Sequence, residues 1–127
     1  MGSKNKLKRF RENEIFDNVV QPSREDVVNG MPQKGKWSQE LFGNDKPIVL
    51  ELGCGKGEYT VGMAEEFPDK NFIGIDIKGA RFWRGAKTAI DNKMDNVGFI
   101  RTQIELVDLI FDENEILMEI ELYPDGY

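Results

Sequence analysis

The chain contains no histidine and a single cysteine, Cys54, among its 127 residues. One cysteine cannot form an internal disulfide, and without histidine the usual zinc-binding spacings cannot be built. The Ser/His and Cys/His pairs that activate most protein nucleophiles are also missing. We therefore expect no metal site and no histidine-based acid/base or hydrolytic chemistry, and we expect Cys54 to pack as a small apolar group.

Long apolar runs are missing as well. No stretch approaches the roughly 20 apolar residues of a membrane-spanning helix, and the basic start is not followed by the apolar segment of a secretory signal. These absences predict a cytoplasmic protein with no membrane partner. Basic residues are absent from the tail, because residues 102–127 carry 8 acidic residues and all 17 basic residues precede them. The net charge of −6 is therefore concentrated in the tail and does not exclude a nucleic-acid partner for the rest.

The composition changes near residue 46. Residues 1–46 open with the basic segment KNKLKRFR (4–11) and continue as polar, turn-rich sequence, which predicts an irregular basic extension with a short helix near 37–43. From residue 47 apolar runs alternate with helical patterns, with strands expected at 48–52, 71–77, 97–101 and 116–122 and helices at 58–67, 80–92 and 104–111. The second part, 47–127, is therefore expected to be α/β: a Rossmann-like parallel sheet with helices on both faces, ending after its fourth strand.

A glycine-rich turn joins the first of these strands to its helix. It reads Gly53-Cys54-Gly55-Lys56-Gly57-Glu58, and glycines at alternate positions let a ligand approach the backbone closely. The dinucleotide fingerprint G-x-G-x-x-G would need glycine where Glu58 stands, and the phosphate loop G-x-x-x-x-G-K-[ST] is absent. Because a carboxylate at the helix start disfavours a pyrophosphate, the turn suits a zwitterionic amino-acid cofactor better than a nicotinamide dinucleotide.

An acidic residue, Asp76, ends the second predicted strand, 19 residues beyond Gly57. In this topology the first two strands end side by side, so Asp76 lies where a carboxylate accepts hydrogen bonds from the two hydroxyls of a ribose. The alternative is that Asp76 caps the helix that starts near Gly79. Turn and aspartate together indicate a nucleoside-containing cofactor more strongly than either does alone.

The segment PIVLELGCGKGEYTVGMAEEFPDKNFIGIDIKGARFWRGAK (47–87) resembles bacterial tRNA (guanine-N7)-methyltransferases, as do the start MGSKNKLKRF and the segment NVGFIRTQIELV. The resemblance implies S-adenosylmethionine as cofactor, tRNA as partner, and formation of 7-methylguanosine. It implies that Glu51 and the turn Gly53-Cys54-Gly55 contact the methionine part, that Asp76 binds the ribose, and that Gln103 neighbours the adenine. Gly57 and Ile77 complete the cofactor-binding residues that we expect.

The resemblance weakens at the end of the chain. The family's Pro-Asp-Pro motif is represented by Pro124-Asp125 followed by Gly126, so Asp125 is either the catalytic residue that orients the guanine or an ordinary turn aspartate. The further strands of family members do not follow, which would expose a central strand as an open edge through which a homo-oligomer could form. The sequence thus leaves two functions open: an active tRNA methyltransferase, and a non-catalytic cofactor-binding remnant or assembly subunit.

Each of two basic stretches also has two possible interpretations. The segment at 4–11 is either an RNA-binding arm, with Phe10 available for base stacking, or a solvated terminus. The basic residues of the second predicted helix form either a basic edge of the ligand cleft or a solvated face, and they are Lys78, Arg81, Arg84 and Lys87. The adjacent aromatics Phe82 and Trp83 cannot both enter the core, so one of them is expected at a surface or an interface.

Overall fold

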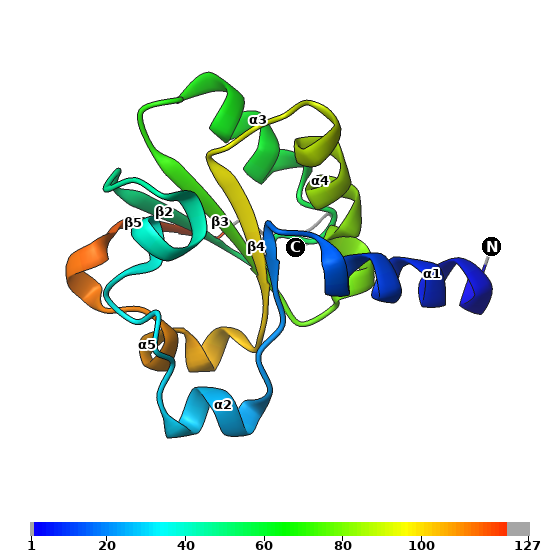
Figure 1. Cartoon of the computed structure of the whole chain (residues 1–127), viewed down its shortest axis with the longest axis horizontal. Coiled ribbons are helices and arrows are strands. Elements are labelled where there is room, and N and C mark those ends of the chain that lie inside the picture. The colour runs from blue at the N-terminus through cyan, green and yellow to red at the C-terminus, as the bar shows by residue number, and fades with distance from the viewer. Residues whose placement is uncertain (1, 122–127) are drawn as a thin grey trace.

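The structure, a computed structural model, describes residues 2–121 and contains a five-stranded sheet in which every pair of neighbours is parallel (Figure 1). The strand order is β1-β4-β3-β2-β5. The strands are β1 (Val19–Val20), β2 (Ile48–Leu52), β3 (Asn71–Asp76), β4 (Val97–Arg101) and β5 (Ile116–Glu121). All four strands expected from the sequence are present, and the order reverses between β2 and β5. This places the topological switch point, where open α/β sheets bind ligands, beside the end of β2.

Helices cover both faces of the sheet, as the alternation of strands and helices predicted. The helices are α1 (Gly2–Ile15), α2 (Arg24–Asn29), α3 (Glu58–Glu66), α4 (Gly79–Asp91) and α5 (Val107–Ile110). Short 3-10 turns at Ile104–Leu106 and Glu113–Glu115 flank α5, and a π-helical turn spans Ser38–Phe42. Among the described residues, no helix has the length and apolarity needed to cross a bilayer.

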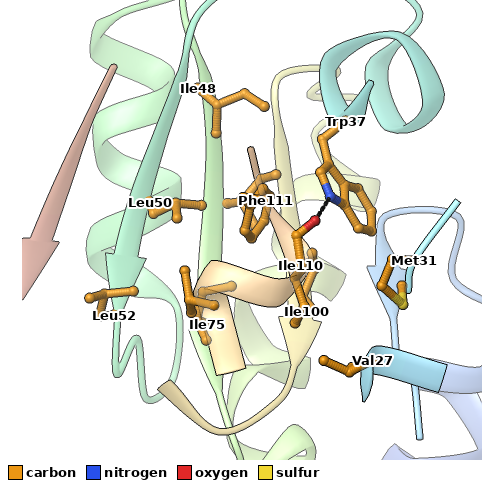
Figure 2. Close-up of a cluster of buried hydrophobic side chains, with 12 residues drawn as sticks. Val27, Met31, Trp37, Ile48, Leu50, Leu52, Ile75, Ile100, Ile110 and Phe111 are labelled. Atoms are coloured by element: carbon orange, nitrogen blue, oxygen red, sulfur yellow. Dashed lines mark hydrogen bonds between the residues drawn. The ribbon is translucent and has the colours of Figure 1, made fainter. Parts of the chain in front are cut away.

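Alternate side chains of the central strands pack into two separate cores. Ile48, Leu50 and Leu52 of β2 pack with α2 and α5, whereas Val49 packs with α3 and α4. Figure 2 shows the first core, in which the buried Trp37 indole N–H donates a 2.8 Å hydrogen bond to the Ile110 carbonyl. Burial on both faces explains why β2 reads as a nearly continuous apolar run.

The expectation of an irregular extension over residues 1–46 is wrong. Helix α1 lies against α4, β1 adds a strand beside β4, and Val27, Met31 and Trp37 belong to the same core as the central strands. The short helix expected near 37–43 is present as the π-helical turn. The extension folds because contacts distant in sequence stabilise it, and its own apolar pattern is too weak to reveal them.

The opposite edge of the sheet is β5, which pairs with β2. Within residues 2–121 its outer side has no partner strand, and Leu117 and Met118 are about half exposed. The open edge that we expected is therefore present in the described part of the chain. Association of copies through this edge stays a prediction.

Candidate cofactor-binding site

The glycine-rich turn is held at the carboxyl end of β2 by the neighbouring strand. Gly53, Gly55 and Gly57 all have positive φ, at 75°, 57° and 79°, a conformation that L side chains rarely adopt. The N–H groups of Gly53 and Cys54 both donate to the Ile75 carbonyl, at 2.7 and 2.9 Å. The turn is thus fixed to the end of β3, and its conformation depends on the glycines.

Gly57 also permits close packing between the turn and helix α4. A Cβ at Gly57 would lie 2.7 Å from the ring of Phe99 and 3.2 Å from the backbone of Gly85. Phe99 is fully buried and stacks on Phe82 with ring centroids 5.3 Å apart. The structure therefore gives Gly57 a packing role, while the cofactor contact that we expected for it stays a prediction.

Asp76 connects the turn to the segment that begins α4. Its Oδ2 accepts a 2.8 Å hydrogen bond from the Gly55 N–H, and its Oδ1 accepts a 2.9 Å bond from the Lys78 N–H. Lys78 precedes the first turn of α4, so Asp76 is not the cap of that helix, which was the alternative reading. A carboxylate offers about four acceptor positions, and two hydrogen bonds leave others for a ligand.

Glu51, near the end of β2, is a buried carboxyl group. Its side chain is 3% exposed and accepts a hydrogen bond from the Thr60 hydroxyl. Burial raises the pKa of Glu51, the Thr60 hydrogen bond opposes this, and the Asp76 charge adds to the rise. Among the described residues no cation forms an ion pair with Glu51. When ionised, this carboxylate therefore has no cationic partner among the described residues.

Cys54 packs as an apolar residue, as expected. It is buried in the core beneath α3 and α4. Burial raises its thiol pKa well above the usual value, and the charges of Asp76 and Glu51 raise it further. The thiol therefore stays protonated and is a poor nucleophile.

A cavity of about 360 Å³ lies at the carboxyl ends of β3 and β4, within the size range of small-molecule sites. Its polar groups include the Asp76 carboxylate and the Gln103 amide, and Ile77 and Ile104 give it exposed apolar surface. The lining residues are Gly53, Asp76, Ile77, Thr102, Gln103, Ile104 and Glu105. Four of the residues that we expected from the sequence thus meet in one cavity.

One neighbour of this cavity could not be found from the sequence. The Arg24 guanidinium of α2 donates a 3.1 Å hydrogen bond to Gln103 Oε1 across 79 residues of sequence. With that oxygen engaged, the Gln103 amide nitrogen is left to donate toward a ligand. The arginine lies in the segment that we expected to be irregular, so no motif pointed to it. Asp125 lies outside the described residues.

Comparison with known proteins identifies the family. A family model described as "Putative methyltransferase" matches residues 45–127, which include the turn, Asp76 and Gln103. The chain belongs to this methyltransferase family.

Curated relatives match most of the chain. The tRNA (guanine-N(7)-)-methyltransferase of Christiangramia forsetii is 65% identical over 98% of this chain and 56% of its own length. The protein of the same name from Porphyromonas gingivalis is 57% identical over 76% of this chain and 40% of its own length. The chain thus spans about half the length of the curated relatives it matches.

A solved structure, the antibiotic-resistance methyltransferase Kmr, resembles the chain more distantly. It is 19% identical to this chain over 68% of this chain and 37% of its own length, with a TM-score of 0.45. This score is too low to support an argument about fold or function, so the fold assignment depends on the sheet itself.

Proposed function

We propose that the chain is the cofactor-binding half of an S-adenosylmethionine-dependent methyltransferase that forms 7-methylguanosine in tRNA. The observation that carries the proposal is the Asp76 carboxylate, which lines the cavity at the carboxyl ends of β3 and β4 and is oriented by two backbone N–H groups. The 65% identity to a relative named as a tRNA (guanine-N(7)-)-methyltransferase supports the choice of substrate.

The ribose of the cofactor fits at Asp76. The Gly55 and Lys78 N–H groups hold the carboxylate from the protein side, and the remaining acceptor positions suit two neighbouring hydroxyl groups. Hydrogen bonds to an ionised acceptor are stronger than those between neutral groups. Asp76 would therefore supply much of the binding energy.

The methionine part fits beside Glu51 and the glycine-rich turn. A buried carboxylate is costly unless it is paired, and the ammonium group of an amino-acid ligand would provide the missing positive charge. Gly53 and Gly55 leave room for such a ligand because they carry no side chain. Cys54 shapes the turn from within the core.

The adenine fits against the exposed side chains of Ile77 and Ile104. Both line the cavity, and apolar side chains that flank a few polar groups are typical of small-molecule sites. The Gln103 amide, held by Arg24, would donate a hydrogen bond to a ring nitrogen of the base. Arg24 would thus act as a positioning residue.

When bound, the cofactor would supply an electrophilic methyl group, for which the in-plane lone pair of guanine N7 is a suitable acceptor. N7 has no proton to remove, so the protein's contribution is mainly to position the two reactants. A chain without histidine is suited to this task. Asp125 stays our proposed catalytic residue for orienting the guanine, and a cytoplasmic location stays a prediction.

A non-catalytic cofactor-binding subunit is the second candidate function. It is favoured by the open edge of β5, whose exposed Leu117 and Met118 suit a further chain. The two candidates share the cofactor site and differ in turnover. Transfer of a labelled methyl group to unmodified tRNA by the 127-residue chain separates them.

Isothermal titration calorimetry with S-adenosylmethionine tests the cofactor assignment. We expect binding that Asp76→Asn weakens roughly tenfold or more, because each lost charge-assisted hydrogen bond is worth about 1.5–3 kcal/mol. Asp95→Asn is the matched control, since Asp95 is exposed and outside the cavity. Titration with NAD should give no heat of binding. Absence of S-adenosylmethionine binding by a folded sample would refute the proposal.

A further inference from the structure

A second cavity, of about 450 Å³, lies beside the cofactor cavity and is lined with positive charge. Five basic side chains from three separate segments reach it: two from α1, one from the residue before α4 together with one from its first turn, and one from the end of β4. They are Lys6, Arg9, Lys78, Arg81 and Arg101. Among the residues that the structure describes, none with an acidic side chain lines this cavity, which we call the basic cavity. Its composition therefore favours an anionic ligand.

None of these cations forms an ion pair with a side chain that the structure describes. The two ion pairs found among the described side chains of residues 5–121 are elsewhere, between Lys70 and Asp69 and between Lys87 and Asp91. Lys78 and Arg81 also lie at the amino end of α4, whose dipole is positive there, and its first turn has no acidic residue. Cations at this end of a helix are unfavourable. A bound anion would reverse that effect.

Helix α1 is fixed against α4, so the cavity is built before any ligand arrives (Figure 1). The Trp83 indole N–H donates a 2.7 Å hydrogen bond to Glu12, and the Asn13 amide donates a 2.9 Å bond to the Gly79 carbonyl. The Arg9 guanidinium lies 4.7 Å from the Trp83 ring centroid. Trp83 is thus the interface aromatic that the pair Phe82-Trp83 predicted, and these contacts hold one wall of the basic cavity in place.

The basic cavity is next to the cofactor cavity. Ile77 lines both, and the Arg81 guanidinium approaches to 3.4 Å of the point where a Cβ on Gly55 would lie. An anion bound among these cations would therefore be close to the glycine-rich turn.

We propose that the basic cavity binds the phosphodiester backbone of the RNA substrate, close to the nucleotide presented to the cofactor. The inference depends on the proposed function, since it names the surface that this substrate would use. Phe10 also lines the cavity, with Lys6 Nζ 5.8 Å from its ring centroid. An aromatic ring among cations fits a nucleotide with a stackable base, whereas a free phosphate needs only the charges.

The experiment compares two double variants of the full chain that remove the same charge. Lys6→Gln with Lys78→Gln neutralises two exposed side chains of the basic cavity, and Lys34→Gln with Lys93→Gln neutralises two exposed side chains outside it. Binding of a fluorescein-labelled, unmodified tRNA transcript is followed by anisotropy over a series of salt concentrations. Binding of S-adenosylmethionine is measured by calorimetry on the same samples.

We expect the basic-cavity variant to weaken RNA binding and the control variant to leave it nearly unchanged. Each lost contact to a single-stranded phosphate lowers the slope of log K against log salt by about 0.7, so the slope should fall by about 1.4. Counterion release contributes little near 1 M salt. The change in slope therefore corresponds to an RNA affinity that is roughly 25-fold lower at 0.1 M salt. Phe10→Leu should also weaken RNA binding, by about fivefold or more.

The other outcomes overturn the inference. Equal loss in both double variants would mean that RNA binds the protein's charge without using the cavity. Competition by inorganic phosphate that matches competition by RNA would mean a site for free phosphate. Loss of S-adenosylmethionine affinity in the basic-cavity variant would assign the cations to the cofactor. If the unsubstituted chain binds S-adenosylmethionine but not RNA, this inference fails alone, whereas absence of cofactor binding refutes the proposed function itself.

Discussion

The contact between helix α4 and the glycine-rich turn can be tested by adding one methyl group at Gly85. In a helix the change Gly→Ala ordinarily stabilises by about 0.5–1 kcal/mol. At Gly85, however, the new Cβ would lie 2.7 Å from Phe99 Cζ and 3.0 Å from Gly57 Cα. Phe99 is fully buried against Phe82, and the other atom is backbone, so neither can move away easily. Overpacking of this kind costs about 1–3 kcal/mol. Taking about 3 kcal/mol for two contacts that cannot move and subtracting a helix-propensity gain of about 1 kcal/mol, we expect Gly85→Ala to lose about 2 kcal/mol of the free energy of unfolding.

Gly62→Ala is the matched control, because Gly62 lies within α3 and a Cβ there would meet no atom within 4 Å. It should stabilise the protein by about 0.5–1 kcal/mol. The helix-propensity gain is common to both variants, so the difference between them measures the overpacking cost. With a urea m-value of about 2 kcal/mol/M, a difference of about 3 kcal/mol separates the two unfolding midpoints by about 1.5 M. Unfolding is followed by tryptophan fluorescence. If the unfolding midpoints of both variants shift equally and in the same direction, the packing argument is refuted.

Two further predictions concern the cofactor site. Burial places the pKa of Glu51 above its ordinary value of 4.5, so the folded state binds more protons and Glu51 loses its stabilising contribution as pH rises through the raised pKa. Glu51→Gln should therefore become more stable relative to the unsubstituted chain as pH rises, as measured by urea titrations. It should also bind S-adenosylmethionine more weakly. A stability difference between the two proteins that is independent of pH would contradict the raised pKa. Arg24→Met should weaken that binding by roughly threefold to tenfold by calorimetry, since a hydrogen bond that orients Gln103 is lost, whereas unchanged affinity would remove Arg24 from the site.

The segments predicted correctly are those whose signal is local. The apolar run of β2 ends at Gly53, and the helix that follows ends before Pro68. Asp76 was located by its distance along the chain from the glycine-rich turn, because neighbouring parallel strands end together. Patterns of this kind are set by residues a few positions apart, so the sequence alone carries them.

The N-terminal segment shows where local patterns were insufficient. The 14 residues of α1 show little apolar periodicity, and β1 has only two residues. Their places are set by contacts with residues more than 60 positions away, such as the bond from Asn13 to Gly79 and the pairing of Val19 with Phe99. A sequence pattern cannot reveal such partners, because their closeness is a product of folding.

The amino-acid sequence by itself determined the α/β class, the central strands, the glycine-rich turn and Asp76, because backbone conformation and strand burial leave periodic signals. Only the tertiary structure decided which side chains meet. It brought Arg24 to Gln103, buried Glu51 beside Thr60 without a cation, and gathered the cations of α1, α4 and β4 around one cavity. Charges distant in sequence act together only when the fold places them within a few ångströms, where water no longer screens them fully.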